Sequence, residues 1–220
     1  MNTVPAIALG VVFVIAIALF SRRAVLLYRL VRLGKPSKRF DDLPGRVRAE
    51  AVVVIGQSKL LQRLLPGLMH AAIFWGFMVL LPTIAIAMIG IVDVHATLPW
   101  LGEQGGYALM VDVFGLLVLV GVVTAFVIRK IQQPPRFVGS HLGEADVILL
   151  WIACIVITLF LWHASRIALG LNEYAAAWAP ISNLLAHAWD GLLGRAVERV
   201  AVWAHVLLIL RVLVYLPYSK

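Results

Sequence analysis

Five stretches of the 220-residue sequence are each long and apolar enough to cross a lipid bilayer as a helix. The hydrocarbon core of a bilayer is about 30 Å thick, so a helix needs roughly 20 mainly apolar residues to span it. Hydrophobic residues make up 62% of the chain and charged residues 14%, which excludes an ordinary soluble domain. We therefore expect an all-α integral membrane bundle of five transmembrane helices in a single domain over residues 1–220, with spans near 4–20, 66–92, 107–128, 146–170 and 197–216.

A transmembrane β-barrel is the alternative fold, because it also satisfies every backbone polar group within the lipid. The strands of such a barrel alternate apolar and polar residues. Apolar runs such as Ile84 to Ile91 lack this alternation, so the sequence favours helices.

The net charge of +8 is unevenly distributed, and the distribution predicts the topology. Eleven of the nineteen Lys and Arg residues lie in the 21–65 connection, and four more lie in the 129–145 connection and at the C-terminus. By the positive-inside rule the N-terminus is outside, and both connections and the C-terminus are cytoplasmic, in a cell inner (cytoplasmic) membrane. The first stretch lacks a small-residue cleavage site and is expected to remain as a span. The basic character reflects this topology, so no nucleic acid is expected as a partner.

Cys154 is the only cysteine in the sequence. The chain therefore offers no disulfide, no four-cysteine iron–sulfur site and no Cys-x-x-Cys-His haem attachment. Any haem would be bound non-covalently, and iron–sulfur clusters would belong only to a partner domain.

The connections also carry structural signals. The first helix is expected to continue beyond the bilayer along an apolar face until Gly34-Lys35-Pro36 stops it. Apolar residues at 52–55 and 60–65 surround Gly56-Gln57 and suggest a short helix at the cytoplasmic surface. The 171–196 connection mixes aromatic and apolar residues and could form a lid at the outer interface.

Three histidines, His70, His163 and His205, lie within the expected spans. An ionisable side chain in the hydrocarbon layer is costly, so it normally faces the bundle interior and has a partner. Haem b is held by imidazoles from facing helices, and the two ligands of an upright haem lie at similar depth. The three residues are therefore candidate haem ligands. The alternative is that they are neutral imidazoles that bond neighbouring helices.

Depth in the membrane discriminates between the possible pairs. At 1.5 Å per residue, His70 lies roughly 6 Å from the cytoplasmic face, whereas His163 lies roughly 10 Å and His205 about 12 Å below the outer face. Geometry alone thus pairs His163 with His205. His70 and His205 differ by about 12 Å along the membrane normal, so pairing them needs strong tilt or a second span that begins before Pro66.

Three further polar residues are candidates for a site. His187 is expected at the outer surface, with contact to haem or quinone as the alternative. Arg211 and Asp112 lie near the ends of their spans, so each either extends to the nearest interface or acts inside the bundle. In the second case Arg211 would hold a haem propionate, and Asp112 would take a proton role at a quinone.

Three segments together resemble the membrane cytochrome b domain related to the nitrate reductase gamma subunit: Gly56-Gln57-Ser58-Lys59-Leu60-Leu61, Pro66 to Phe77, and Tyr215-Leu216-Pro217-Tyr218-Ser219-Lys220. The chain is more closely similar to the N-terminal part of fused heterodisulfide-reductase-related iron–sulfur proteins, including the electron-transfer-flavoprotein:menaquinone oxidoreductase type. The similarity covers nearly the whole chain, including Arg136 to His141.

This resemblance implies a function in electron transfer. One or two non-covalent haem b groups would pass electrons between a cytoplasmic iron–sulfur domain or subunit and menaquinone or another quinone, with electron-transfer flavoprotein as a further partner. His70 would be the first axial ligand of the second helix, and His205 an axial ligand of the fifth. Arg211 would face a propionate.

The sequence departs from the family in two places. Leu80 stands where the nitrate reductase subunit has a further axial histidine, so the usual partner of His205 is missing. Family members also continue past the Pro-Tyr-Ser-Lys stretch with more histidines, so a following cytoplasmic iron–sulfur domain is expected. Two alternatives stay open: a non-redox membrane anchor or assembly module, and a small transporter. The lack of an internal repeat disfavours the transporter.

Overall fold

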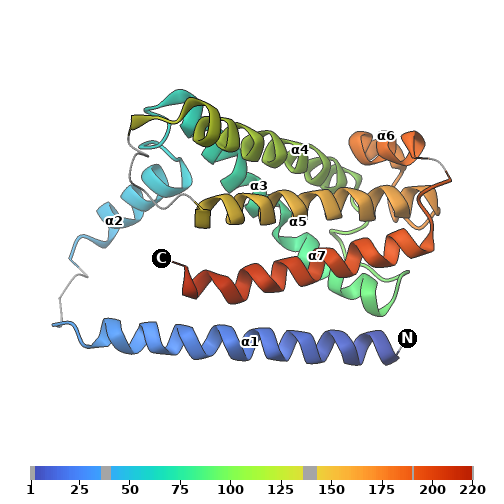
Figure 1. Ribbon diagram of the computed structural model, residues 1–220, viewed down its shortest axis with the longest axis horizontal. Coiled ribbons are helices and arrows are strands. Elements are labelled where there is room, and N and C mark those ends of the chain that lie inside the picture. The colour runs from blue at the N-terminus through green and yellow to red at the C-terminus, as the bar shows by residue number, and fades with distance from the viewer. Residues whose placement is uncertain (1–2, 36–40, 136–142, 190, 220) are drawn as a thin grey trace.

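The computed structural model describes residues 3–35, 41–135, 143–189 and 191–219 of the chain. Five long helices run alternately up and down in a bundle (Figure 1), and each is apolar and long enough to cross a membrane. They are α1 (Thr3–Arg32), α3 (Leu64–Val92), α4 (Gly105–Val127), α5 (Gly143–Ala168) and α7 (Arg195–Tyr215). The described residues contain no strand, and the prediction of an all-α membrane bundle with five spans is confirmed.

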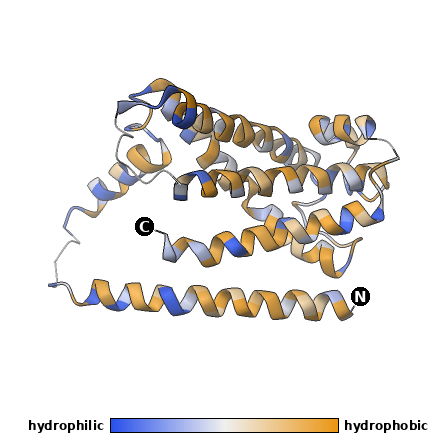
Figure 2. Cartoon of the chain, viewed as in Figure 1, coloured by the Kyte–Doolittle hydropathy of each residue, from blue (hydrophilic) through white to orange (hydrophobic). Residues whose placement is uncertain are grey.

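The long helices begin and end at two opposite ends of the bundle. At one end, here called the basic end, α1, α4 and α7 finish and α3 and α5 begin. There α4 continues into a π-helical turn, η2 (Ile128–Gln132), and α7 into a 3-10 turn, η5 (Leu216–Tyr218). Figure 2 shows that hydrophobic residues predominate along the long helices. Helix α1 extends to Arg32, as the apolar face before Gly34 predicts.

The short surface helix lies earlier in the chain than predicted. Helix α2 (Leu43–Glu50) and the π-helical η1 (Ala51–Ile55) precede Gly56, and the residues after it form turns. Asp42 caps α2 by accepting a hydrogen bond from the Gly45 N–H at 3.1 Å, and proline in the first turn fits there because no N–H is needed. The predicted helical character of residues 60–63 is wrong, because Gln57 adopts a left-handed φ of 52° and ends the helix.

Small residues allow α3 and α4 to approach closely. A Cβ added to Gly76 would clash with Val118, and one added to Gly121 would lie 2.9 Å from Ile73 and 3.1 Å from the Met69 carbonyl. Such small-residue contacts are a common means of joining helices in lipid, where no hydrophobic force draws apolar surfaces together.

Pro82 lies inside the continuous helix α3, and two side-chain hydroxyls donate to backbone carbonyls of the turn before it. The Tyr107 hydroxyl donates to the Val79 carbonyl at 3.1 Å, and the Thr83 hydroxyl donates to the Leu80 carbonyl at 2.6 Å. These bonds matter because a free carbonyl in lipid is costly.

The described residues of the connection before α7 pack against the opposite end of the bundle. It contains the short η4 (Ala176–Trp178) and α6 (Pro180–Ala188), which lies beside α4 and α5 (Figure 1). Asp112 of α4 is 1% exposed and binds the start of α6, accepting hydrogen bonds from the Ile181 N–H at 2.6 Å, the Ser182 N–H at 3.1 Å and the Ser182 hydroxyl at 2.6 Å. Asp112 therefore neither extends to solvent nor points into a site: it caps α6.

Candidate functional site

His70 stands near the start of α3 with its orientation fixed by Gln57. The His70 Nδ1 atom lies 2.9 Å from Gln57 Oε1, while Gln57 Nε2 donates to the Val54 carbonyl at 2.5 Å. Because the amide nitrogen is used on Val54, the amide oxygen faces the imidazole and accepts the Nδ1 proton. The Nε2 atom of His70 therefore keeps its lone pair.

A tight turn holds Gln57 in position. Gln57 is 4% exposed, and its carbonyl accepts the N–H groups of Leu60 and Leu61 at 3.0 Å each. The turn folds back onto α3 so closely that a Cβ on Gly67 would collide with the Leu60 backbone. Gln57, which the sequence placed within the predicted surface helix and within a segment of the family resemblance, thus has a direct structural role toward His70.

A groove of about 310 Å³ opens beside His70 at the basic end. It lies between α3, α4, η2 and α5, and its walls are mainly apolar; they include Met69, Ile73, Ala125, Ile148 and Ile152. Arg129 also lines the groove, with its Nε atom 3.0 Å from Asp146 Oδ1. No second histidine lines the groove among the residues that the structure describes.

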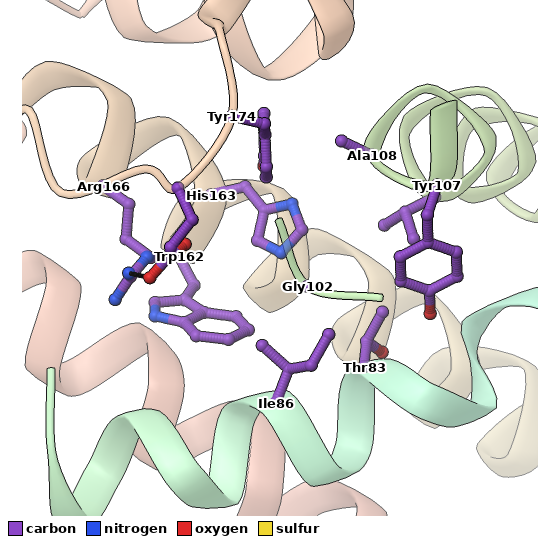
Figure 3. A pocket seen from close by; sticks show the side chains of 11 residues that line it. Thr83, Ile86, Gly102, Tyr107, Ala108, Trp162, His163, Arg166 and Tyr174 are labelled. Atoms are coloured by element: carbon purple, nitrogen blue, oxygen red, sulfur yellow. Dashed lines mark hydrogen bonds and ion pairs between the residues drawn. The ribbon is translucent and has the colours of Figure 1, made fainter. Parts of the chain in front are cut away.

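His163 borders a small polar cavity near the opposite end of the bundle. The cavity is about 30 Å³, and Figure 3 shows His163 among Tyr107, Trp162 and Tyr174 around it. A space of this size suits a bound water molecule and does not admit a haem.

Polar groups next to this cavity are buried and paired. Arg166 donates to the Val94 carbonyl at 3.1 Å and to the Leu171 carbonyl at 2.5 Å, and it forms an ion pair with Glu173. Burial raises the pKa of the Glu173 carboxyl, although Arg166 acts in the other direction. Burial also raises the pKa of the Tyr174 hydroxyl.

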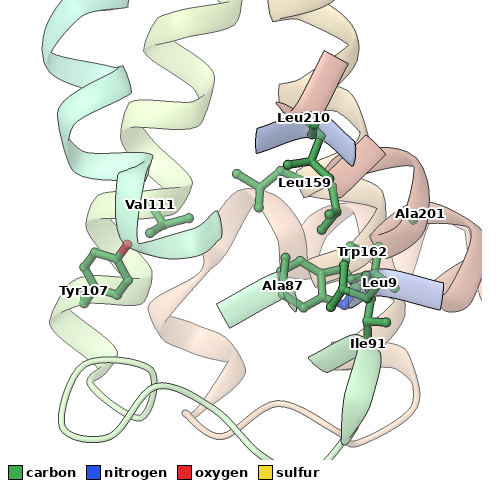
Figure 4. Close-up of a cluster of buried hydrophobic side chains, with 12 residues drawn as sticks. Leu9, Ala87, Ile91, Tyr107, Val111, Leu159, Trp162, Ala201 and Leu210 are labelled. Atoms are coloured by element: carbon green, nitrogen blue, oxygen red, sulfur yellow. The ribbon is translucent and has the colours of Figure 1, made fainter. Parts of the chain in front are cut away.

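His205 has the same hydrogen-bonding pattern as His70 but no open space. Its Nδ1 atom lies 2.9 Å from the Ile155 carbonyl, and its Nε2 atom is buried with no hydrogen-bond partner among the described residues. The residue is 1% exposed, and its ring lies 6.4 Å from that of Trp162 at an interplanar angle of 27°. Trp162 belongs to the main cluster of buried hydrophobic side chains (Figure 4).

The structure brings His163 and His205 into one layer and leaves His70 in another. The centroid of the Trp162 ring is 5.1 Å from the centroid of the His163 ring and 6.4 Å from that of the His205 ring, so Trp162 contacts both imidazoles. At 1.5 Å per residue, His70 lies roughly 33 Å from the opposite end of α3, whereas His205 lies roughly 15 Å from the start of α7. Helix α3 begins before Pro66, which is one of the two conditions under which His70 could pair with His205, but the two residues still lie at different levels of the bundle.

The two layers differ in their fit to haem. His70 offers a free Nε2 lone pair beside an apolar groove, which suits an axial ligand whose other nitrogen is held by an oxygen. His205 offers the same lone pair, but Trp162 and the surrounding core fill the space. A haem between His163 and His205 would require Trp162 to move, so the packed layer does not fit the group.

The remaining candidates lie apart from both layers. His187 is exposed in the last turn of α6, and Arg211 is exposed on α7 with its guanidinium carbon 4.7 Å from the centre of the Trp151 ring. At 100° per residue, Arg211 projects about 120° away from His205 around α7. Leu80 packs against the hydrophobic core. His141 and Arg136 lie outside the described residues.

Sequence reasoning missed one buried acid. Glu198 is fully buried, and its Oε1 atom accepts the Trp162 indole N–H at 3.3 Å, while the Arg199 Nε atom lies 3.7 Å from its Oε2. Its position in the first turn of an apolar helix is the signal that could have found it. The described residues contain no group of three or more His, Cys, Asp and Glu side chains that could hold a bare metal ion.

Comparison with known proteins relates the chain to oxidoreductases. It is 27% identical over 197 residues to the EtfAB:quinone oxidoreductase of Syntrophomonas wolfei, covering 83% of this chain and 27% of that protein. It is 26% identical over 201 residues to the probable iron-sulfur-binding oxidoreductase FadF of Bacillus subtilis, covering 86% of this chain and 27% of that protein. The chain thus spans about a quarter of the length of these curated relatives. No protein-family model and no solved structure matches it significantly.

Proposed function

We propose that the chain is the membrane-embedded electron-transfer part of an oxidoreductase. In this proposal it holds haem b through His70 and passes electrons between an iron–sulfur partner at the cytoplasmic face and menaquinone or another quinone in the bilayer. The basic end would be the cytoplasmic end, as the positive-inside rule predicts.

The observation that carries the proposal is the state of the His70 imidazole. Its Nδ1 atom lies 2.9 Å from the buried amide oxygen of Gln57 and donates its proton to it. Its Nε2 atom stands beside a groove of about 310 Å³ at the basic end. Metal-bound histidines almost always have their second nitrogen held in this way, which fixes the ring and increases its basicity.

The relatives support the wider assignment. One relative is an EtfAB:quinone oxidoreductase, and the other is a probable iron–sulfur-binding oxidoreductase. We infer that this chain supplies the membrane part of a comparable system, with iron–sulfur clusters and electron-transfer flavoprotein belonging to partners.

The residues around His70 have separate tasks in this proposal. A bound haem b supplies the one-electron carrier. Gln57 keeps the imidazole in one tautomer and orientation, and the apolar side chains of α3, α4 and α5 exclude water from the groove. Arg129 adds a positive charge to the wall, where it is also held by Asp146.

A reduced-minus-oxidised absorption spectrum of the purified chain tests the proposal, with haem counted per polypeptide. We expect a b-type spectrum, one haem per chain, and reoxidation of the reduced haem when a soluble naphthoquinone is added. Two haems per chain would contradict the assignment of His205 to the packed layer.

The second candidate function is a non-redox membrane anchor or assembly module. The packing of His205 favours it, because this intramembrane histidine of α7 contacts Trp162 and the Ile155 carbonyl of α5 and so joins two helices. A folded chain that binds no haem would favour this function over the redox proposal.

A further inference from the structure

A long groove separates α1 from α7 on the outside of the bundle. Its volume is about 560 Å³. The α1 wall includes Val12, Ile15 and Leu19, and the α7 wall includes Leu207, Leu210 and Val214. Each set recurs every three or four residues, so two apolar helix faces border one channel.

Two arginines stand at the basic end of this groove. Arg211 and Tyr218 line it, and Arg23 continues the α1 face one turn beyond Leu19. The Arg23 guanidinium carbon is 5.3 Å from the centre of the Tyr218 ring, and its Nε atom donates to the Pro217 carbonyl at 3.2 Å. Neither arginine has a carboxylate partner among the described residues. Within the described part of the chain, the apolar groove therefore ends in two cations that no carboxylate side chain neutralises.

The aromatic wall at this end is held in place. The Tyr215 ring packs edge-on against Trp151 with ring centres 4.9 Å apart, and the Tyr215 hydroxyl donates to Glu144 Oε1 at 2.5 Å. The Arg211 guanidinium in turn lies over Trp151. The position of the Arg211 charge is thus supported by packed neighbours.

The length of the groove matches one leaflet of a membrane. From Val12 to Arg23 the α1 face runs roughly 17 Å at 1.5 Å per residue. Half of a hydrocarbon core of about 30 Å is close to this value. A ligand that fits would therefore have an acyl-length apolar part and an anionic group at the level of the arginines.

We propose that this groove binds an anionic glycerophospholipid, with its phosphate on Arg211 and Arg23 and an acyl chain along the faces of α1 and α7. Charge selects this occupant. A zwitterionic lipid brings its own cation to the same place, and the uncharged ring of a quinone neutralises neither arginine.

Thermal unfolding of the full chain in neutral detergent, titrated with dioleoylphosphatidylglycerol or dioleoylphosphatidylcholine, tests the proposal. We expect phosphatidylglycerol to stabilise the wild type at lower concentration and added salt to weaken its effect. Arg211→Gln and Arg23→Gln should each weaken its binding about fivefold. Arg32→Gln is the matched control, because Arg32 also lies over an aromatic ring, that of Tyr28 at 6.0 Å, but outside the groove.

Each remaining outcome has a definite meaning. Arg211→Lys should keep most of the binding because it keeps the charge. Equal stabilisation by the two lipids would overturn the proposal. So would an equal loss of phosphatidylglycerol binding in Arg32→Gln and Arg211→Gln. A naphthoquinone with an isoprenoid tail that displaces phosphatidylglycerol, and binds the Arg211→Gln variant unchanged, would assign the groove to quinone instead. These readouts do not depend on haem, so they are independent of the proposed redox function.

Discussion

His70 and His205 share one hydrogen-bonding pattern but have opposite surroundings. In each imidazole the Nδ1 atom lies 2.9 Å from an oxygen, the Gln57 amide in one case and the Ile155 carbonyl in the other. His70 is exposed beside a groove of about 310 Å³, whereas His205 is 1% exposed and lies against Trp162.

This difference shows that an imidazole nitrogen with a free lone pair is not by itself sufficient to form a ligand site. The free lone pair of His205 faces a filled core, where the side chain contributes packing and a helix-to-helix hydrogen bond. The free lone pair of His70 stands beside space that a planar cofactor can enter. The hydrogen-bonding pattern of the imidazole is the same in the two places, and the available space separates their roles.

The largest expected effects come from exchanging the two histidines for alanine. His70→Ala should remove nearly all bound haem, whereas the haem-free variant should unfold much as the haem-free wild type does, because the residue is exposed. His205→Ala should leave haem content unchanged and lower the free energy of unfolding by about 2–4 kcal/mol, as other large-to-small core changes do. Haem quantification and thermal unfolding measure both effects, with the exposed His187→Ala as the control. Loss of haem in His205→Ala would contradict the comparison, because it would show that His205 also supports haem binding.

Removing the cap at the opposite end should affect stability alone. Asp112→Ala would leave two backbone N–H groups and a hydroxyl of α6 without their acceptor, so we expect a loss of about 2–3 kcal/mol. Asp112→Asn keeps one carbonyl acceptor and should lose less. Unfolding in mixed micelles measures the loss of stability. Haem content measures whether the site at the basic end is unaffected by the substitution. If haem falls together with stability, the two ends are coupled.

Gln57 provides a finer test of the open site. Gln57→Ala removes the acceptor for His70 Nδ1, and losing such a supporting bond costs about 10–100-fold in metal affinity. Haem titration of the purified chain should show this decrease. Gln62→Ala, in the same turn region but exposed, should bind haem as the wild type does. Equal haem affinities for the two variants would show that Gln57 does not support haem binding.

The smallest expected effect is a pH dependence at the opposite end. Because burial raises the pKa of Glu173 above 4.5, the folded chain binds this proton more tightly than the unfolded chain. The resulting stability is present at low pH and is lost as pH rises through the raised pKa. Melting temperatures measured from pH 4 to about pH 7 should therefore fall more steeply for the wild type than for Glu173→Gln. Parallel curves would show that Glu173 titrates as an ordinary carboxyl.

Much of the fold was predictable because its signals are local. Each span is long and apolar, and the hydropathy of each segment predicts it without reference to the others. The surface helix was misplaced because apolar residues at 60–65 suggested a helix, while the Asp42 cap and the left-handed Gln57 decided where it begins and ends. Depth matching placed His163 and His205 at a similar level but gave no sign that Trp162 contacts both rings.

Hydropathy alone determined that this chain is a five-helix membrane bundle, because the cost of placing polar groups in lipid acts on each segment independently of its neighbours. The roles of the histidines were decided only by the tertiary structure. Gln57 is thirteen residues from His70 and Ile155 is fifty residues from His205, so the atoms that hold each ring come from other segments. The folded bundle also decided which imidazole faces open space, because that depends on how the helices pack.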